Sequence, residues 1–131
     1  MLESNDIRLL TEVGFLAAAR ADVKRAEAIF GALVLLRPDR NFPYIGLAMA
    51  YLNADRRDEA VKALDRGVPL VREDDQGELQ SVRALALQLA GRAGESRRAL
   101  QAAGASPLAQ ALQGNSPEQH KAQVIMTAEE H

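Results

Sequence analysis

The chain has 131 residues, a formal net charge of −2 and no cysteine. Its length suits one domain with a buried core, and the absence of cysteine excludes disulfides, thiol nucleophiles and metal sites with cysteine ligands. The balance of charges argues against a nucleic-acid-binding protein, which would carry a basic surplus on one face. The N-terminal residues lack the features of a signal peptide, and no stretch approaches the roughly 20 apolar residues of a membrane span. We therefore expect a cytoplasmic protein that does not insert into membranes.

Two helices are predicted over residues 6–20 and 23–36, which together form a first hairpin, residues 6–36. In the first helix apolar or small residues recur at a helical period, at Ile7, Leu10, Val13, Gly14 and Ala17. Asp22 is placed to cap the second helix. Arg37 and Pro38 end it, because the residue before a proline is disfavoured in helical dihedrals.

A second hairpin is predicted over residues 42–67. Its first helix begins at Asn41 or Phe42 and ends near residue 53, with Pro43 in the first turn, where a missing N–H costs nothing. Its second helix is predicted over 56–66. We expect Gly67 to adopt the left-handed conformation that closes many helices.

A third hairpin is predicted over residues 76–103. Asp75 and Glu78 have the spacing of a capping box for a helix over 76–91, and residues 92–94 are expected to form the turn. Ala99 is taken as the counterpart of Ala60, which implies five extra residues in the preceding linker. Residues 105–131 are expected to form a C-terminal cap and tail, with helices over 107–113 and 117–129 that begin at the two Ser-Pro pairs.

The first two hairpins share a pattern at a spacing of 34 residues. The matched pairs are Leu10 and Tyr44, Val13 and Leu47, Gly14 and Ala48, Ala17 and Tyr51, Ala26 and Ala60, and Phe30 and Leu64. This pattern, with Pro38 closing the first copy, resembles the tetratricopeptide repeat (TPR). The resemblance implies an all-α, TPR-like α-solenoid of three helical hairpins over residues 1–104, the third degenerate, with a C-terminal capping helix. Seven residues are then expected to pack the repeats together: Gly14, Ala26, Phe30, Ala48, Tyr51, Ala60 and Leu64.

In TPR-like stacks the first helix of each hairpin lines a concave groove. The residues expected on that face are Arg8, Thr11, Phe15, Ala18, Phe42, Ile45, Met49, Leu52, Ser81, Ala84, Gln88 and Gly91. Four of them, Phe15, Phe42, Ile45 and Met49, are not required by the hairpin pattern. We therefore expect an apolar groove that binds an amphipathic helix or apolar segment. A foreign protein, a second copy of the chain and another part of the same chain remain open as its occupant.

The sequence carries no catalytic constellation and no phosphate-binding loop. The two histidines, His120 and His131, do not form a metal-binding pair on one helix face with Glu118, Glu129 or Glu130. The carboxylates of residues 73–78 lack the spacing of a calcium loop. We therefore expect a non-enzymatic protein without metal or cofactor.

Within the TPR proteins, the segment from Leu9 to Gly67 is similar to the small bacterial chaperones of type III secretion. That resemblance implies a cytoplasmic chaperone that holds an apolar or amphipathic segment of a secreted subunit. The alternatives are a general TPR adaptor or assembly scaffold, a self-dimerising module, and an accessory domain of an enzyme.

Overall fold

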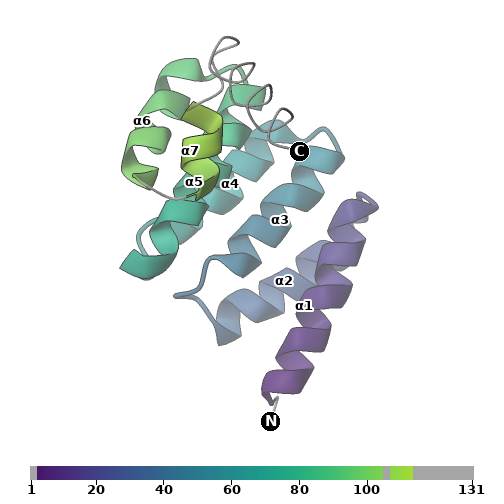
Figure 1. Ribbon diagram of the computed structural model, residues 1–131. Coiled ribbons are helices and arrows are strands. Elements are labelled where there is room, and N and C mark those ends of the chain that lie inside the picture. The colour runs from purple at the N-terminus through teal and green to yellow at the C-terminus, as the bar shows by residue number, and fades with distance from the viewer. Residues whose placement is uncertain (1–2, 105–106, 114–131) are drawn as a thin grey trace, which may run out of the picture.

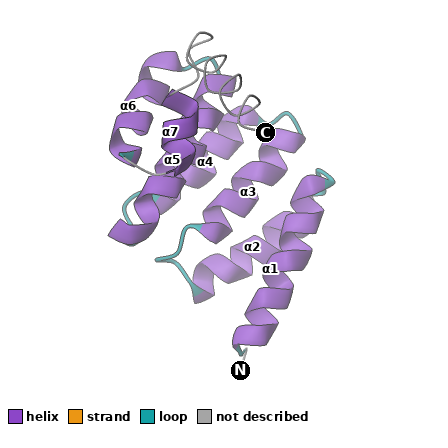
Figure 2. Ribbon diagram, in the orientation of Figure 1, coloured by secondary structure: helices purple, strands orange, loops and turns teal. Residues whose placement is uncertain are grey.

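The protein is all-α throughout the part that the structure, a computed structural model, describes, which is residues 3–104 and 107–113. Those residues form seven helices and no strand (Figure 1 and Figure 2). The helices are α1 (Ser4–Ala19), α2 (Val23–Leu36), α3 (Phe42–Asn53), α4 (Arg57–Gly67), α5 (Glu73–Leu89), α6 (Ala93–Ala103) and α7 (Pro107–Gln113). None of them combines the length and apolar character that crossing a membrane requires.

The helix ends follow from local capping. Asp22 caps α2 as predicted, since its carboxylate accepts a hydrogen bond from the N–H of Arg25 at 3.2 Å. Helix α1 begins two residues earlier than predicted because Glu3 and Asp6 form a capping box, in which the Asp6 carboxylate accepts the N–H of Glu3 at 3.1 Å. The predicted bounds of α2 and α7 match the structure.

Two of the predicted helix-end residues have other roles. Gly67 is the last residue of α4 and does not have a positive φ; a Cβ there would lie 2.8 Å from the Tyr44 ring, so the glycine is needed for packing. Asp75 does not form a capping box with Glu78, because α5 begins earlier, at Glu73. Its carboxylate instead accepts hydrogen bonds from Arg40 Nε at 2.9 Å and from the backbone N–H of Asn41 at 3.0 Å.

The same turn joins the helices of each hairpin. The N–H groups of Asp22, Arg56 and Arg92 donate to the carbonyls of Ala17, Tyr51 and Leu87 at 2.9, 2.7 and 2.8 Å. The residue before each donor has a positive φ: 57° at Ala21, 61° at Asp55 and 78° at Gly91. The turns are therefore spaced by 34 and 36 residues along the chain.

This spacing corrects the alignment of the third hairpin, which is displaced from the 34-residue period by two residues and not by five. The turn lies at 90–92, and not at 92–94, because Gly91 adopts the left-handed conformation. The counterpart of Ala60 is then Ser96 and not Ala99. Serine is tolerated at this buried helix crossing because its hydroxyl donates to the carbonyl of Ala84 at 2.7 Å.

The helices form two layers that bend. Helix α1 contacts α3, and α3 contacts α5, whereas α2 does not contact α4 and α4 does not contact α6. Because the layer whose helices lie closer together is on the inside of a bend, α1, α3 and α5 line the inner face (Figure 1). Helix α7 packs against α5 and α6 at the end of the array.

Phe30 of α2 joins the first two hairpins. Its side chain is fully buried and meets the Phe15 ring edge to face, with the ring centroids 4.9 Å apart. A Cβ added at Gly14 would lie 2.8 Å from the Phe30 ring, and one added at Gly46 would overlap it. The two glycines thus let α1 and α3 approach the ring. All seven residues expected to pack the repeats are buried.

Candidate protein-binding face

The inner face is built from equivalent positions of α1, α3 and α5. Counted from the shared turn, Phe15, Met49 and Leu85 occupy one repeat position. Neighbouring rows consist of Thr11, Ile45 and Ser81, and of Ala18, Leu52 and Gln88. The five-residue displacement expected from the sequence made Ala84 the counterpart of Ile45 and Gln88 that of Met49. The observed two-residue displacement makes Leu85 the counterpart of Met49. Ala84 is buried, with 1% of its surface exposed.

The predicted groove residues differ in exposure. Arg8 and Gln88 are exposed, whereas Ile45 is 9% exposed and Ala18 is fully buried. Five others are half-buried: Thr11, Phe15, Phe42, Met49 and Leu52.

The apolar side chains of this face belong to the packing of the hairpins. Ile45 is a member of the core, and Phe15, Phe42 and Met49 pack against it. The expectation that the hairpins do not need these four residues is therefore wrong. The physical reason is that α1 and α3 lie side by side, so large side chains on this face fill the space between them.

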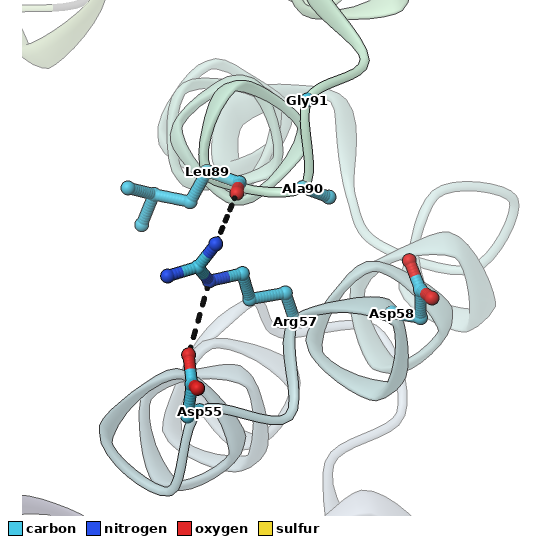
Figure 3. A pocket seen from close by; sticks show the side chains of 6 residues that line it. All are labelled: Asp55, Arg57, Asp58, Leu89, Ala90 and Gly91. Atoms are coloured by element: carbon cyan, nitrogen blue, oxygen red, sulfur yellow. Dashed lines mark hydrogen bonds and ion pairs between the residues drawn. The ribbon is translucent and has the colours of Figure 1, made fainter.

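A hollow of about 410 Å³ on the edge of the array is polar. Asp55, Arg57 and Asp58, near the α3–α4 turn, line it together with residues 89–91 of the α5–α6 turn. Figure 3 shows the Arg57 guanidinium between the two turns, where Nη1 donates to the carbonyl of Leu89 at 3.2 Å and Nε lies 3.1 Å from the Asp55 carboxylate. Because this cation already has two partners, the hollow offers little to a ligand.

A second hollow, of about 280 Å³, lies beside Leu85. It lies between α5, α6 and α7 and is partly open to solvent, and its lining residues are Ala84, Leu85, Gln88, Ser96, Leu100 and Leu112. Leu85 itself is 39% exposed. The hollow thus combines leucine walls with two polar side chains, the arrangement that accepts an apolar group and orients it.

Polar contacts fix the position of α3 against the first hairpin. The Tyr51 hydroxyl donates to the Glu27 carboxylate of α2 at 2.5 Å, and Asn53 Nδ2 donates to the carbonyl of Ala18 at 2.9 Å. The Arg56 guanidinium lies 5.0 Å from the centre of the Tyr51 ring. Burial and the bond to Glu27 raise the pKa of Tyr51 to about 12. These contacts tie α3 to both helices of the first hairpin.

No group of three acidic or histidine side chains that could bind a metal ion occurs among residues 3–104 and 107–113. The two histidines, with Glu118, Glu129, Glu130 and the predicted helix over 117–129, lie outside the described residues. The chain matches no model of a known protein family and no curated protein.

Another apolar surface was not singled out from the sequence. Leu9, Val13 and Leu16 of α1 are 61%, 40% and 52% exposed. The apolar period of the sequence predicts that Val13 lies on the same side of α1 as the core residues Gly14 and Ala17. In the structure no described helix covers Val13, which is 40% exposed. The spacing of the three residues, one helical turn apart, is the signal that could have revealed the stripe.

Proposed function

We propose that the protein is a non-enzymatic protein-binding module, a TPR-like solenoid whose inner face holds the apolar side of an amphipathic helix from another protein. The observation that carries this proposal is the row of Phe15, Met49 and Leu85. A large apolar side chain, partly open to solvent, occupies the same repeat position in α1, α3 and α5. The recurrence of one hairpin turn at spacings of 34 and 36 residues supports the TPR-like arrangement.

The half-burial of this row suits reversible binding. Because Phe15 and Met49 already pack against the core, the free protein exposes little apolar surface on this face. A partner helix would cover what remains, with anchor side chains at helical spacing. The hollow beside Leu85 would accept one of these anchors. Met49 would allow more than one shape of anchor, because its side chain is unbranched and flexible.

The narrower form of the proposal follows the resemblance to type III secretion chaperones. A secreted subunit with an amphipathic helix would assemble too early unless its apolar side were covered in the cytoplasm of the bacterium. The inner face would cover such a helix until export. On this reading the partner is a small secreted subunit, and the protein needs no cofactor.

Leu85→Glu tests the proposal. The tagged protein is used to capture partners from its native cells, the captured protein is identified by mass spectrometry, and its affinity is then measured with the purified pair. Because Leu85→Glu places a charge in the apolar row, beside the hollow expected to accept an anchor side chain, we expect affinity to fall by roughly tenfold or more. A secreted subunit among the captured proteins would support the chaperone form.

Leu35→Glu is the matched control, since Leu35 is 84% exposed and lies on α2, away from the inner face. This variant should bind as the wild type does. Circular dichroism shows whether both variants are folded. If folded Leu85→Glu keeps full affinity, the inner face is not the binding site.

A further inference from the structure

The stripe on α1 formed by Leu9, Val13 and Leu16 is a second apolar surface, separate from the inner face. The three side chains lie four and three residues apart, which places them on one side of the helix. Among residues 3–104 and 107–113, the N-terminal end of α2 borders this side of α1 at Asp22 and Arg25, but the three side chains stay 40–61% exposed. Such a contiguous group of exposed aliphatic residues on a helix indicates a contact surface.

The second hairpin shows what this side of a first helix is used for. The counterparts of Leu9, Val13 and Leu16 in α3 are Pro43, Leu47 and Ala50. All three are buried, and α3 packs against both helices of the first hairpin. The side that is an interface in α3 is therefore uncovered in α1.

The charges beside the stripe indicate which molecule covers it. Asp6 and Arg20 lie seven residues before and after Val13, on the same side of the helix, and both are exposed. If a second α1 runs antiparallel with its Val13 opposite the first, each Asp6 lies next to Arg20 of the other copy. Opposite charges thus meet at both ends of the pair, which is the self-complementarity that a two-fold interface requires.

The shape of the surface agrees with this register. A small hollow of about 70 Å³ is lined by Val13, Leu16, Ala17, Arg20, Asp22 and Arg25. In the antiparallel pair, Leu9 of one copy lies opposite Ala17 of the other, which is at this hollow. The most exposed residue of the stripe therefore meets a depression of its partner, as a knob meets a hole in packed helices.

We propose that a second copy of this chain binds here, with α1 antiparallel to α1 about a two-fold axis at Val13. Leu9 of each copy enters the hollow of the other, and Asp6 pairs with Arg20. A helix of 16 residues is about 24 Å long, so the interface is at the small end of specific ones, and the dimer is reversible. The inner face is on another side of α1 and stays uncovered in this arrangement.

Sedimentation equilibrium of the full chain, over a range of concentrations at low salt, tests the proposal. We expect a monomer–dimer equilibrium. Val13→Glu puts two carboxylates opposite each other at the axis and should weaken the dimer by roughly tenfold or more. Leu35→Glu, the same change at an exposed leucine away from the stripe, should leave it intact. A wild type that stays monomeric at every concentration, or a dimer that Val13→Glu does not weaken, overturns the proposal.

The charge pair tests the register. Arg20→Glu alone places like charges together and should dissociate the dimer. Asp6→Arg does the same, and it also removes the bond between Asp6 and the N–H of Glu3 at the start of α1. An equal mixture of the two variants should form a heterodimer, since the introduced arginine of one copy then meets the introduced glutamate of the other. At the opposite end of the pair, the unchanged Arg20 and Asp6 meet as they do in the wild type. High salt should weaken this recovery. A mixture that associates no better than its components shows that the antiparallel arrangement is wrong.

Discussion

Gly46→Ala is expected to destabilise the protein through one methyl group. Gly46 lies in the middle of α3 and faces Phe30 of α2, and a Cβ there would overlap the ring. The ring cannot move aside easily, because it is fully buried and a Cβ added at Gly14 would also be only 2.8 Å from it. Phe15 closes a further side, with its ring centre 4.9 Å away. The substitution must therefore separate α1, α2 and α3.

The size of the effect follows from two opposing contributions. Overpacking a core by a methyl group costs about 1–3 kcal/mol, and a deep overlap belongs at the upper end of that range. Replacing glycine by alanine inside a helix returns about 1 kcal/mol. The net loss in the free energy of unfolding is therefore about 2 kcal/mol. For a chain of this length, that loss lowers Tm by roughly 5–10 °C.

Gly31→Ala is the matched control, because Gly31 lies in the middle of α2 and a Cβ there would meet nothing within 4 Å. This variant should gain about 0.5–1 kcal/mol. Urea denaturation followed by circular dichroism measures both changes. The double variant Gly46→Ala, Phe30→Leu should lose less free energy of unfolding than the two single variants lose together, since the smaller side chain relieves the overlap. A Gly46→Ala protein as stable as the wild type would refute the close approach of α3 to Phe30.

Three further predictions concern turns and polar contacts. Ala21→Gly should stabilise the protein by about 0.5–1 kcal/mol, and Gly91→Ala should destabilise it by about 1 kcal/mol, because both positions have positive φ; urea denaturation of the two variants checks these opposite signs. The pKa of Tyr51 is raised to about 12 from an ordinary value of 10. The stability that the neutral phenol contributes is therefore complete below pH 10 and is lost as the pH rises through 12. Tyr51→Phe should remove this alkaline loss of stability when denaturation is measured against pH. Burial opposes ionisation of Asp75, yet the bonds from Arg40 and the N–H of Asn41 hold the pKa of Asp75 below its usual value. The stability that the Asp75 carboxylate contributes is therefore present above about pH 4 and is lost as the pH falls further. Asp75→Asn should cost roughly 1–2 kcal/mol at neutral pH and should make stability depend less on pH in the acid range.

The helix positions could be predicted because their signals are local. Asp22 caps α2 and Pro43 lies in the first turn of α3, and both effects depend only on neighbouring residues. Gly67 could not be assigned in this way, because glycine serves both left-handed turns and close packing, and only the position of the Tyr44 ring distinguishes them.

The candidate site was less predictable because it depends on how the hairpins pack. Ser96 did not look like the counterpart of Ala60, since a hydroxyl is expected at a buried crossing only when an acceptor is near, and that acceptor lies in another helix. The resulting alignment error of three residues then put Gln88 in the row of Met49, where the structure has Leu85. Burial of Ile45 likewise depends on the distance between neighbouring helices, which the periodicity of one helix does not contain.

The two loops that connect the hairpins are bonded to each other. The N–H of Arg72 donates to the carbonyl of Asp39 at 2.8 Å, and the Asn41 side-chain amide donates to the carbonyl of Asp75 at 3.0 Å. Loop amides usually exchange their hydrogens with water quickly, because local fluctuations open them. Here the N–H groups of Asn41 and Arg72 donate to Asp75 and Asp39 across the junction of the second and third hairpins, so we expect them to exchange mainly when these hairpins separate. Two loop residues thus become reporters of that separation, and their exchange rates measure how tightly the array is held together at its middle.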